Sequence, residues 1–579
     1  MNLNFINNNN SFIITGALPY ANGEIHLGHI SSTYLPADIF ARFLRKLGKK
    51  VYFICASDDY GTPILIKAEK ENKTPEQFVQ YWNSRDREDF ASISISFDKF
   101  YKTSSKENVE FVQDFFLKLK DNGYIYEKDV IQFFCDYDNK FLPDRYVLGT
   151  CPYCNSDNQY SDLCEKCGRV PQEILDPKCG ICGKPPTKKS SKHYFFKLSS
   201  FSEKLRTWLS ENENLQTDIK RYVINWIDEG LDDWDITRDI SWGIPVPLDN
   251  AHGKVFYGWF DNHLCYISTT MTILADENNV DGKKFWNDSQ IYHFIGKDIV
   301  YHHFLFLPAM RMGVDNEYKL PDFIPCRGHL MLQNQKISKS RNWYIGLRDF
   351  ISQYDQDYLR FYLASISSYS QDDINFDWDL FYEKINNELI DNVGNFINRV
   401  LSYTKKQYNG IVPQPITEFD SDDKICLEKI STIENEVAKF ISSIEVDKAL
   451  KEILKFSNYF NQYFQTKSPW KNKEGTANTT VYLSLNAVRE LTLVLEPFIP
   501  NSCSKIWLQL GYSETETEKI KTNENVIDKE DNNNKDSMEK LKIRPGHILG
   551  EVSPLFKKIE KSDIEKQKLK LQNNLSVKT

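Results

Sequence analysis

The feature that most constrains the fold is a strand, a turn and a helix close to the N-terminus. Residues 11–18 form an apolar run that ends in a turn rich in proline, asparagine and glycine, which is typical of a buried strand. Residues 30–47 follow with the pattern of a helix that ends at Gly48, and residues 51–56 form a second apolar strand. This order predicts a strand–turn–helix–strand unit of an α/β fold.

The turn carries His26, Gly28 and His29, which places both imidazoles at the N-terminus of the predicted helix. Free backbone N–H groups and the positive end of the helix dipole favour anions there. Imidazoles can donate hydrogen bonds to a phosphate as it gains charge, and Gly28 would let an adenine ring lie against the backbone. Because the pattern is short, a helix cap with two surface histidines explains it equally well.

A second short motif, Lys336-Ile337-Ser338-Lys339-Ser340, lies about three hundred residues downstream. Residues 325–332 predict a strand and residues 333–340 a polar loop. Lysines on a mobile loop can reach the β- and γ-phosphates of a nucleotide and neutralise leaving pyrophosphate. Such a cluster alone is more typical of a solvated loop, but its place downstream of a nucleotide-binding unit favours the phosphate site.

Length and composition limit the class of protein. A chain of 579 residues predicts three or four domains. The N-terminus has no signal-peptide pattern, and no apolar run approaches the ~18 residues of a membrane span, so we expect a soluble protein of the cytoplasm with no membrane partner. The net charge of −9 does not indicate nucleic-acid binding, although a local basic surface can coexist with it.

Seven of the twelve cysteines lie between Cys135 and Cys182. Two Cys-x2-Cys turns separated by nine residues are the pattern of a four-thiolate zinc site, and disulfides are the alternative, which a reducing cytosol disfavours. The predicted ligands of this first zinc are Cys151, Cys154, Cys164 and Cys167.

A third Cys-x2-Cys turn has no cysteine partner pair. Asp138 stands where a second cysteine would follow Cys135, and carboxylate oxygen is an acceptable zinc ligand. The predicted second, interleaved site is Cys135, Asp138, Cys179 and Cys182; the alternative is an empty knuckle with packed cysteines.

The two short motifs, in this order, are similar to the paired nucleotide-binding signatures of class I aminoacyl-tRNA synthetases. The surrounding residues resemble the methionyl-tRNA synthetases over nearly the whole chain, from about residue 11 to 512 and again at 554–560. The segments that carry the resemblance are residues 17–23, 141–145, 234–239 and 294–301.

The resemblance implies an α/β fold class: a split Rossmann-type catalytic domain with a zinc-knuckle insertion, followed by an all-α anticodon-binding bundle. An apolar repeat at 389–401 with spacings of three and four supports the helical part. Residues 7–10 and 513–540 have the composition of disordered chain. The sequence does not continue into the appended tRNA-binding or dimerising domain of some family members, so we expect a monomer. The expected parts are 1–123 and 230–345 for the two catalytic halves, 124–229 for the insertion, 346–386 for a linking segment, 387–512 for the bundle, 513–545 for a disordered linker and 546–579 for a C-terminal segment.

The family's reaction has two steps. Methionine attacks Mg²⁺-ATP to give methionyl-adenylate and pyrophosphate, and the methionyl group passes to initiator or elongator tRNA(Met). Carried over by motif, His26 and His29 hold the ATP phosphates, Lys336 and Lys339 the pyrophosphate end, and Asp58 the substrate ammonium. The remaining ATP-binding positions are Gly28, Gly296, Asp298 and Ser338, and the methionine-binding positions are Ala17, Leu18, Tyr20, Trp259, Tyr266, Ile299 and His303.

Some residues depart from the family pattern or have an ordinary structural explanation. Asn262 and His263 are larger and more polar than the small residues expected beside Asp261, and Asn342 replaces a common glycine after the lysine loop. Any one of the pocket aromatics could instead be a core residue.

The bundle carries the predicted anticodon contacts. Trp470 matches a family tryptophan that stacks on an anticodon base, and Asn387, Asn392 and Asn395 could read base edges nearby. The alternative is that Trp470 packs between helices. One rival function is a class I synthetase for another amino acid. The short insertion disfavours the leucine, isoleucine and valine enzymes, and the pocket sequence disfavours the cysteine enzyme. The other rival is a non-catalytic tRNA-binding relic, which the retained histidines and lysines disfavour.

Overall fold

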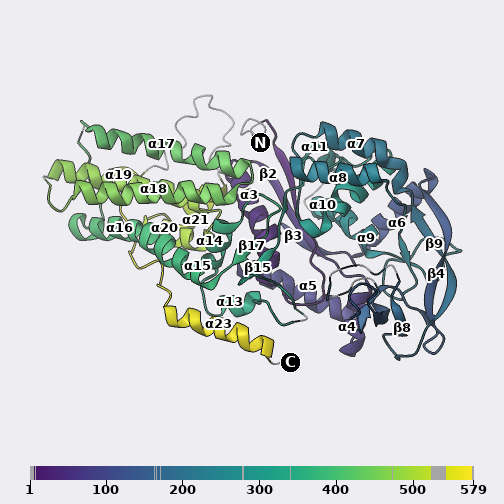
Figure 1. The fold of residues 1–579 in the computed structure, drawn as a ribbon. Coiled ribbons are helices and arrows are strands. Elements are labelled where there is room, and N and C mark those ends of the chain that lie inside the picture. The colour runs from purple at the N-terminus through teal and green to yellow at the C-terminus, as the bar shows by residue number, and fades with distance from the viewer. Residues whose placement is uncertain are drawn as a thin grey trace.

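The computed structural model describes residues 6, 8–161, 164, 166–167, 169, 171, 173–276, 280–339, 341–416, 418–472, 474–522 and 543–576. The described chain has a helical bundle at one end, a β-rich insertion at the other and a parallel sheet with its helices between them (Figure 1). None of the helices in these ranges is long and apolar enough to cross a membrane.

A five-stranded parallel sheet forms the centre of the catalytic part. Its strand order is β14-β13-β1-β2-β3, so strands from two distant parts of the chain lie side by side. The pairing of β1 with β13 aligns Phe12 with Gln290 and Gly16 with Phe294. This arrangement confirms that two separate halves make one α/β fold. The strands are β1 (Ser11–Gly16), β2 (Lys50–Ser57), β3 (Lys99–Lys102), β13 (Gln290–Gly296) and β14 (Cys326–Arg327).

The sheet is apolar on both faces because helices cover both. Successive residues of β1 and β2 alternate between two buried clusters: Ile13 and Ile54 belong to one, and Ile14 and Phe53 to the other. The predicted strand at 325–332 is instead two short strands, β14 and β15 (Leu330–Leu332). The main covering helices are α3 (Leu35–Lys46), α5 (Pro75–Ser92), α6 (Lys106–Asp121) and α10 (Cys265–Asp276).

The insertion is built from antiparallel strands. Its long hairpin pairs β4 (Ile125–Cys135) with β9 (Thr187–Phe196), and a smaller sheet has the order β7-β6-β8. The strands of the smaller sheet are β6 (Val147–Thr150), β7 (Gln159–Tyr160) and β8 (Leu175–Cys179).

The bundle follows the predicted apolar repeat. Leu389, Val393, Phe396, Val400 and Leu401 are all buried against neighbouring helices, as spacings of three and four require. The bundle contains a π-helical segment, η7 (Lys384–Gly394), and the helices α16 (Asn395–Tyr408), α17 (Ser421–Ser442), α18 (Val446–Lys467), α19 (Glu474–Leu495) and α20 (Pro500–Gln509).

Two segments expected to be disordered are in part ordered. Residues 514–522 form α21 (Glu514–Thr522), which begins with a reciprocal cap in which Ser513 and Glu516 exchange hydrogen bonds of 2.8 and 3.2 Å. The sequence Ser-x-x-Glu carries that capping signal, so composition misled the prediction there. At the N-terminus, the carbonyl of Asn10 accepts a 2.9 Å hydrogen bond from the Lys50 N–H. Residues 523–540 and Asn7 lie outside the described residues.

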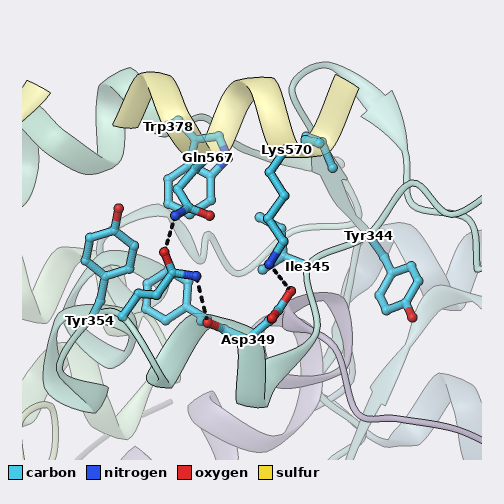
Figure 2. A pocket seen from close by; sticks show the side chains of 10 residues that line it. Tyr344, Ile345, Asp349, Tyr354, Trp378, Gln567 and Lys570 are labelled. Atoms are coloured by element: carbon cyan, nitrogen blue, oxygen red, sulfur yellow. Dashed lines mark hydrogen bonds and ion pairs between the residues drawn. The ribbon is translucent and has the colours of Figure 1, made fainter. Parts of the chain in front are cut away.

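The C-terminal helix α23 (Lys561–Ser576) lies back against the segment that follows the lysine loop (Figure 2). Lys570 pairs with Asp349 of α13 (Leu347–Ile351) at 2.7 Å, and Lys568 pairs with Asp379 of α15 (Trp378–Glu383) at 2.7 Å. Tyr344, which follows the lysine loop, lines the cavity of about 20 Å³ beneath this helix, a space for about one water molecule.

Candidate active site and metal-binding clusters

The two histidines occupy the turn between β1 and the helix that follows it. His26 caps α2 (Leu27–His29): its Nδ1 accepts from the Gly28 N–H at 3.2 Å, while its own N–H donates to Nδ1 of His29 at 3.1 Å. The rings stack with centroids 3.7 Å apart. Because each Nδ1 is an acceptor, each neutral ring presents Nε2–H as a donor. Burial and the Lys339 charge lower the pKa of His26 to about 3, so the ring is neutral at physiological pH.

The lysine loop lies directly beside this turn. The Leu27 N–H donates to the Ile345 carbonyl at 3.3 Å, and the Leu347 N–H donates to the Ile25 carbonyl at 3.0 Å. Lys336, on β16 (Gln335–Lys336), and Lys339 are exposed, and Ser338 is half-buried. Loss of solvent in the cleft and the nearby charge of Lys67 lower the pKa of Lys339 to about 8. The two motifs therefore come together, and the histidines are both a helix cap and part of a cationic cleft.

Three buried carboxylates lie at the carboxyl end of β2 and near it. Asp58, Asp59 and Asp261 are each at most 2% exposed, and none forms an ion pair with another described residue. Hydroxyls of Ser57 and Ser104 donate to Asp59 at 2.6 and 2.5 Å, whereas neither oxygen of Asp261 has a partner among the described residues. Burial, followed by the charge of Asp59, raises the pKa of Asp58 to about 8. Such a group of acids favours a cationic ligand such as an ammonium.

An aromatic and imidazole cluster lies beside the carboxylates. His303 donates from Nδ1 to the Ile299 carbonyl at 3.1 Å, which leaves Nε2 to accept from the Tyr266 hydroxyl at 3.2 Å. Tyr266 and His303 are buried, Trp259 and Ile299 are half-buried, and Tyr20 is 43% exposed. Exposure of Tyr20 shows that it is not a core residue.

The N-terminal side of this cluster is positioned by main-chain pairing. The Ala17 N–H donates to the Phe294 carbonyl at 3.0 Å, which joins Ala17 and the following Leu18 to the end of β13. The Ala21 N–H donates to the Asp58 carbonyl at 2.9 Å and the Asp58 N–H donates to the Pro19 carbonyl at 2.8 Å. The predicted methionine-binding residues therefore meet at one end of the sheet, although they come from both halves of the chain.

Two of the residues that depart from the family pattern, Asn262 and His263, lie beside this cluster. Asn262 donates to Asp58 Oδ2 at 3.5 Å, and its own Oδ1 is 3.2 Å from Nδ1 of His263. His302, which the sequence did not single out, is 3% exposed, and neither of its ring nitrogens has a hydrogen-bond partner among the described residues. Its ring lies 3.4 Å from that of Trp259, edge to face. The sequence did not single out Asp261 or His302, because their burial beside Asp58 and Trp259 depends on residues distant in sequence.

The predicted ribose contacts lie at the end of β13. A Cβ placed on Gly296 would meet no atom within 4 Å, so the backbone is open to a ligand. Asp298 is 75% exposed at its side chain and accepts a 2.7 Å hydrogen bond from Nε2 of His329. That bond holds the pKa of Asp298 below its ordinary value. His329 was not predicted from the sequence.

Both predicted zinc-ligand sets come together in the insertion. In each set the four ligand atoms lie within 4.8 Å of one another. In the first set Sγ of Cys151 is 3.8 Å from Sγ of Cys167, and Sγ of Cys154 is 3.6 Å from Sγ of Cys164. A tetrahedral zinc ion with Zn–S bonds of about 2.3 Å requires sulfurs about 3.8 Å apart, so the donors fit.

The second set fits the same geometry with one carboxylate. Asp138 Oδ2 is 3.0 Å from Sγ of Cys135 and 3.2 Å from Sγ of Cys179, and Sγ of Cys135 is 3.5 Å from Sγ of Cys182. The carboxylate oxygen and the three sulfurs are therefore close enough to bind one ion.

The predicted anticodon residues differ in exposure. Trp470 is 45% exposed beside the Arg399 guanidinium, and Asn387 and Asn395 are exposed. Asn392 is committed to α18, since its amide donates to the Leu454 carbonyl at 3.0 Å and its oxygen accepts from Asn461 at 3.2 Å. Of the three asparagines, Asn387 and Asn395 are therefore the ones on the exposed surface of the bundle.

The fold and the site together define a class I tRNA synthetase. Its features are a split parallel sheet, two histidines at the first turn, a lysine loop after the last strand of the sheet and a C-terminal helical bundle. Residues 12–401 match the family "tRNA synthetases class I (M)", and residues 423–576 match "Anticodon-binding domain of tRNA ligase". The chain is 41% identical to a methionine–tRNA ligase of Methanobrevibacter smithii over 97% of this chain and 82% of that protein. It is 40% identical to one of Thermococcus onnurineus over 96% of this chain and 75% of the relative. The chain belongs to the methionine–tRNA ligase family.

A solved structure has the same fold. The crystal structure of Mycobacterium tuberculosis methionyl-tRNA synthetase bound by methionyl-adenylate has a TM-score of 0.76, 22% identity, and coverage of 94% of this chain and 100% of that one. The apo form of the same enzyme has a TM-score of 0.69 with 22% identity, and the match covers 95% of this chain and 98% of that one.

Proposed function

We propose that this chain joins methionine to tRNA(Met), initiator and elongator, in the cytoplasm. The observation that carries the proposal is the meeting of two sites at the carboxyl edge of one parallel sheet. One is a cationic cleft of histidines and lysines, and the other is a group of buried carboxylates beside an aromatic cluster. The first suits polyphosphate and the second suits an amino acid with an apolar side chain.

In the first step, a carboxylate oxygen of methionine attacks the α-phosphorus of ATP. The bond from that phosphorus to the bridging oxygen of the β-phosphate breaks, and pyrophosphate leaves with the electron pair. His26 and His29 donate Nε2–H bonds to phosphate oxygens, and Lys336 and Lys339 balance the charge that builds up on pyrophosphate. Gly28 and Ser338 border this cleft. Mg²⁺, when bound with ATP, supplies further charge neutralisation on the phosphates.

The remaining roles concern the two substrates' other ends. Asp58 holds the methionine ammonium, while Gly296 and Asp298 border the adenosine ribose. Tyr266 and His303 hold each other in fixed orientations, so the thioether lies against rigid ring surfaces. In the second step the 3′-terminal hydroxyl of tRNA attacks the activated carbonyl, and AMP leaves.

We propose that the two cysteine-rich clusters hold zinc. The first is formed by four thiolates and the second by three thiolates and Asp138. The first set lies in the turns around β6 and β7, and the second joins the end of β4 to the end of β8, so a bound ion would hold the insertion together rather than react. The bundle would bind the anticodon, with Trp470 stacking on a base and Asn387 and Asn395 as candidates for base-edge contacts.

The test is amino-acid-dependent exchange of labelled pyrophosphate into ATP with each of the twenty amino acids. Methionine should drive exchange far better than leucine, isoleucine or cysteine. His26→Ala and Lys339→Ala should each slow exchange by orders of magnitude, because the two side chains stabilise charge mainly in the transition state. Exchange with leucine at the methionine rate, or full activity without Lys339, would contradict the proposal.

A further inference from the structure

Two lysine ammonium groups converge on Gly23 in the turn after β1. A Cβ placed on Gly23 would lie 3.5 Å from Nζ of Lys339 and 3.7 Å from Nζ of Lys67. Lys67 belongs to α4 (Thr62–Lys70), a helix that neither phosphate-binding motif includes. Its ammonium donates a 2.5 Å hydrogen bond to the Asn22 carbonyl, which holds the charge at the mouth of the cleft.

Neither ammonium has a carboxylate partner within ion-pair distance among the described residues. The two acids that would be the natural partners are already engaged: Glu24 pairs with Arg85 at 2.7 Å, and Glu71 pairs with Lys73 at 2.7 Å. Like charges that approach each other without a counter-ion destabilise the site until an anion enters between them. The cluster is therefore arranged for an anion that comes from outside the described chain.

The surroundings indicate which anion. Both lysines are exposed, so a ligand can reach them, and the half-buried imidazoles of His26 and His29 lie close enough for the Lys339 charge to lower the pKa of each. The charges of Asp86, which is buried, and of Glu24 act against the lowering of the Lys339 pKa, but partial desolvation and the charge of Lys67 outweigh both. Ammonium point charges and neutral N–H donors on one cleft form a binding site for phosphate groups.

We propose that Lys67 is a further phosphate-binding residue of the adenylation site. Together with Lys339, it binds the β- and γ-phosphates of ATP and then the leaving pyrophosphate. The inference rests on the proposed function. The same phosphate chemistry could come from the 3′ end of tRNA, and a third role for Lys67 would be purely structural, through its bond to Asn22.

Pyrophosphate exchange in the absence of tRNA separates these roles. Wild-type exchange with methionine is measured first, and its absence would remove the proposed function rather than this inference. Lys67→Gln removes the charge but keeps a donor for Asn22, and Lys67→Arg keeps the charge. Lys70→Gln, an exposed lysine on the same helix, is the matched control.

We expect Lys67→Gln to raise the KM for ATP and for pyrophosphate tenfold or more, with the KM for methionine changed less than twofold. Lys67→Arg should recover most of the loss, and Lys70→Gln should match the wild type. Unchanged exchange in Lys67→Gln overturns the inference. If the exchange is unchanged while a separate aminoacylation assay shows a raised KM for tRNA, Lys67 serves the 3′ end of tRNA instead. A loss that Lys67→Arg does not recover and that accompanies a lower Tm assigns Lys67 a structural role and also overturns it.

Discussion

Replacing Arg360 by leucine should destabilise the junction between the catalytic part and the bundle by about 3–5 kcal/mol. Arg360 lies on α14 (Gln356–Ile366), and both its side chain and that of Asp38 are 0% exposed. Nη2 of Arg360 is 2.7 Å from Asp38 Oδ2, while its other donors reach backbone carbonyls that include Phe498 at 2.9 Å and Ile93 at 3.1 Å. Removal of the guanidinium leaves these carbonyls without that hydrogen-bond donor, which costs about 1–3 kcal/mol each. It also removes one of the two positive charges that pair with the buried Asp38 carboxylate.

Asp38 keeps a second partner, Arg42 at 2.8 Å, which places the expected loss within that range rather than above it. Urea unfolding followed by circular dichroism measures the loss as a shift in the transition midpoint. Lys568→Ala, which breaks the exposed pair with Asp379, is the control and should cost less than about 1 kcal/mol. A midpoint for Arg360→Leu that matches this control would refute the reasoning.

The pH dependence of the same variant has a defined sign. Burial alone would raise the pKa of Asp38, but Arg42 and Arg360 outweigh it and lower that pKa to about 2. A carboxyl group whose pKa is lower in the folded state stabilises the protein fully above its unfolded pKa of about 4 and loses that contribution as pH falls towards 2. The difference in stability between wild type and Arg360→Leu should therefore shrink below pH 4.

Three further results are expected. The KM for methionine in pyrophosphate exchange should fall about tenfold per pH unit between pH 6 and 7. Burial and Asp59 raise the pKa of Asp58 to about 8, and the methionine ammonium binds only the ionised form of Asp58. A KM that does not change with pH would contradict this. Elemental analysis should find two zinc ions per chain in the native protein. Asp138→Ala and Cys151→Ala should each contain one zinc ion. Two zinc ions in Asp138→Ala would exclude the second site. Trp470→Ala should leave exchange nearly intact while tRNA charging falls tenfold or more, since stacking on one base is worth about 1–3 kcal/mol; equal losses with a lower Tm would make Trp470 a structural residue.

The features that could be predicted from sequence are those whose chemistry is contiguous. Each Cys-x2-Cys turn brings two sulfurs together by itself, and Asp138 was identified because it stands three residues after Cys135. The apolar repeat of the bundle is likewise local, since it depends only on helical geometry. Where a local signal was overlooked, as at the Ser513 cap of α21, the prediction of disorder was wrong for residues 514–522.

Sequence alone therefore determined the motifs, the ligand sets and the succession of α/β and helical parts. The tertiary structure decided that β13 lies beside β1, that Asp261 joins Asp58 in one buried group and that Lys67 approaches Lys339. Each of these pairs is separated by more than two hundred residues. Their proximity follows from the order of strands in the sheet and from helix packing, which depend on the burial of the whole apolar surface rather than on any short stretch of chain.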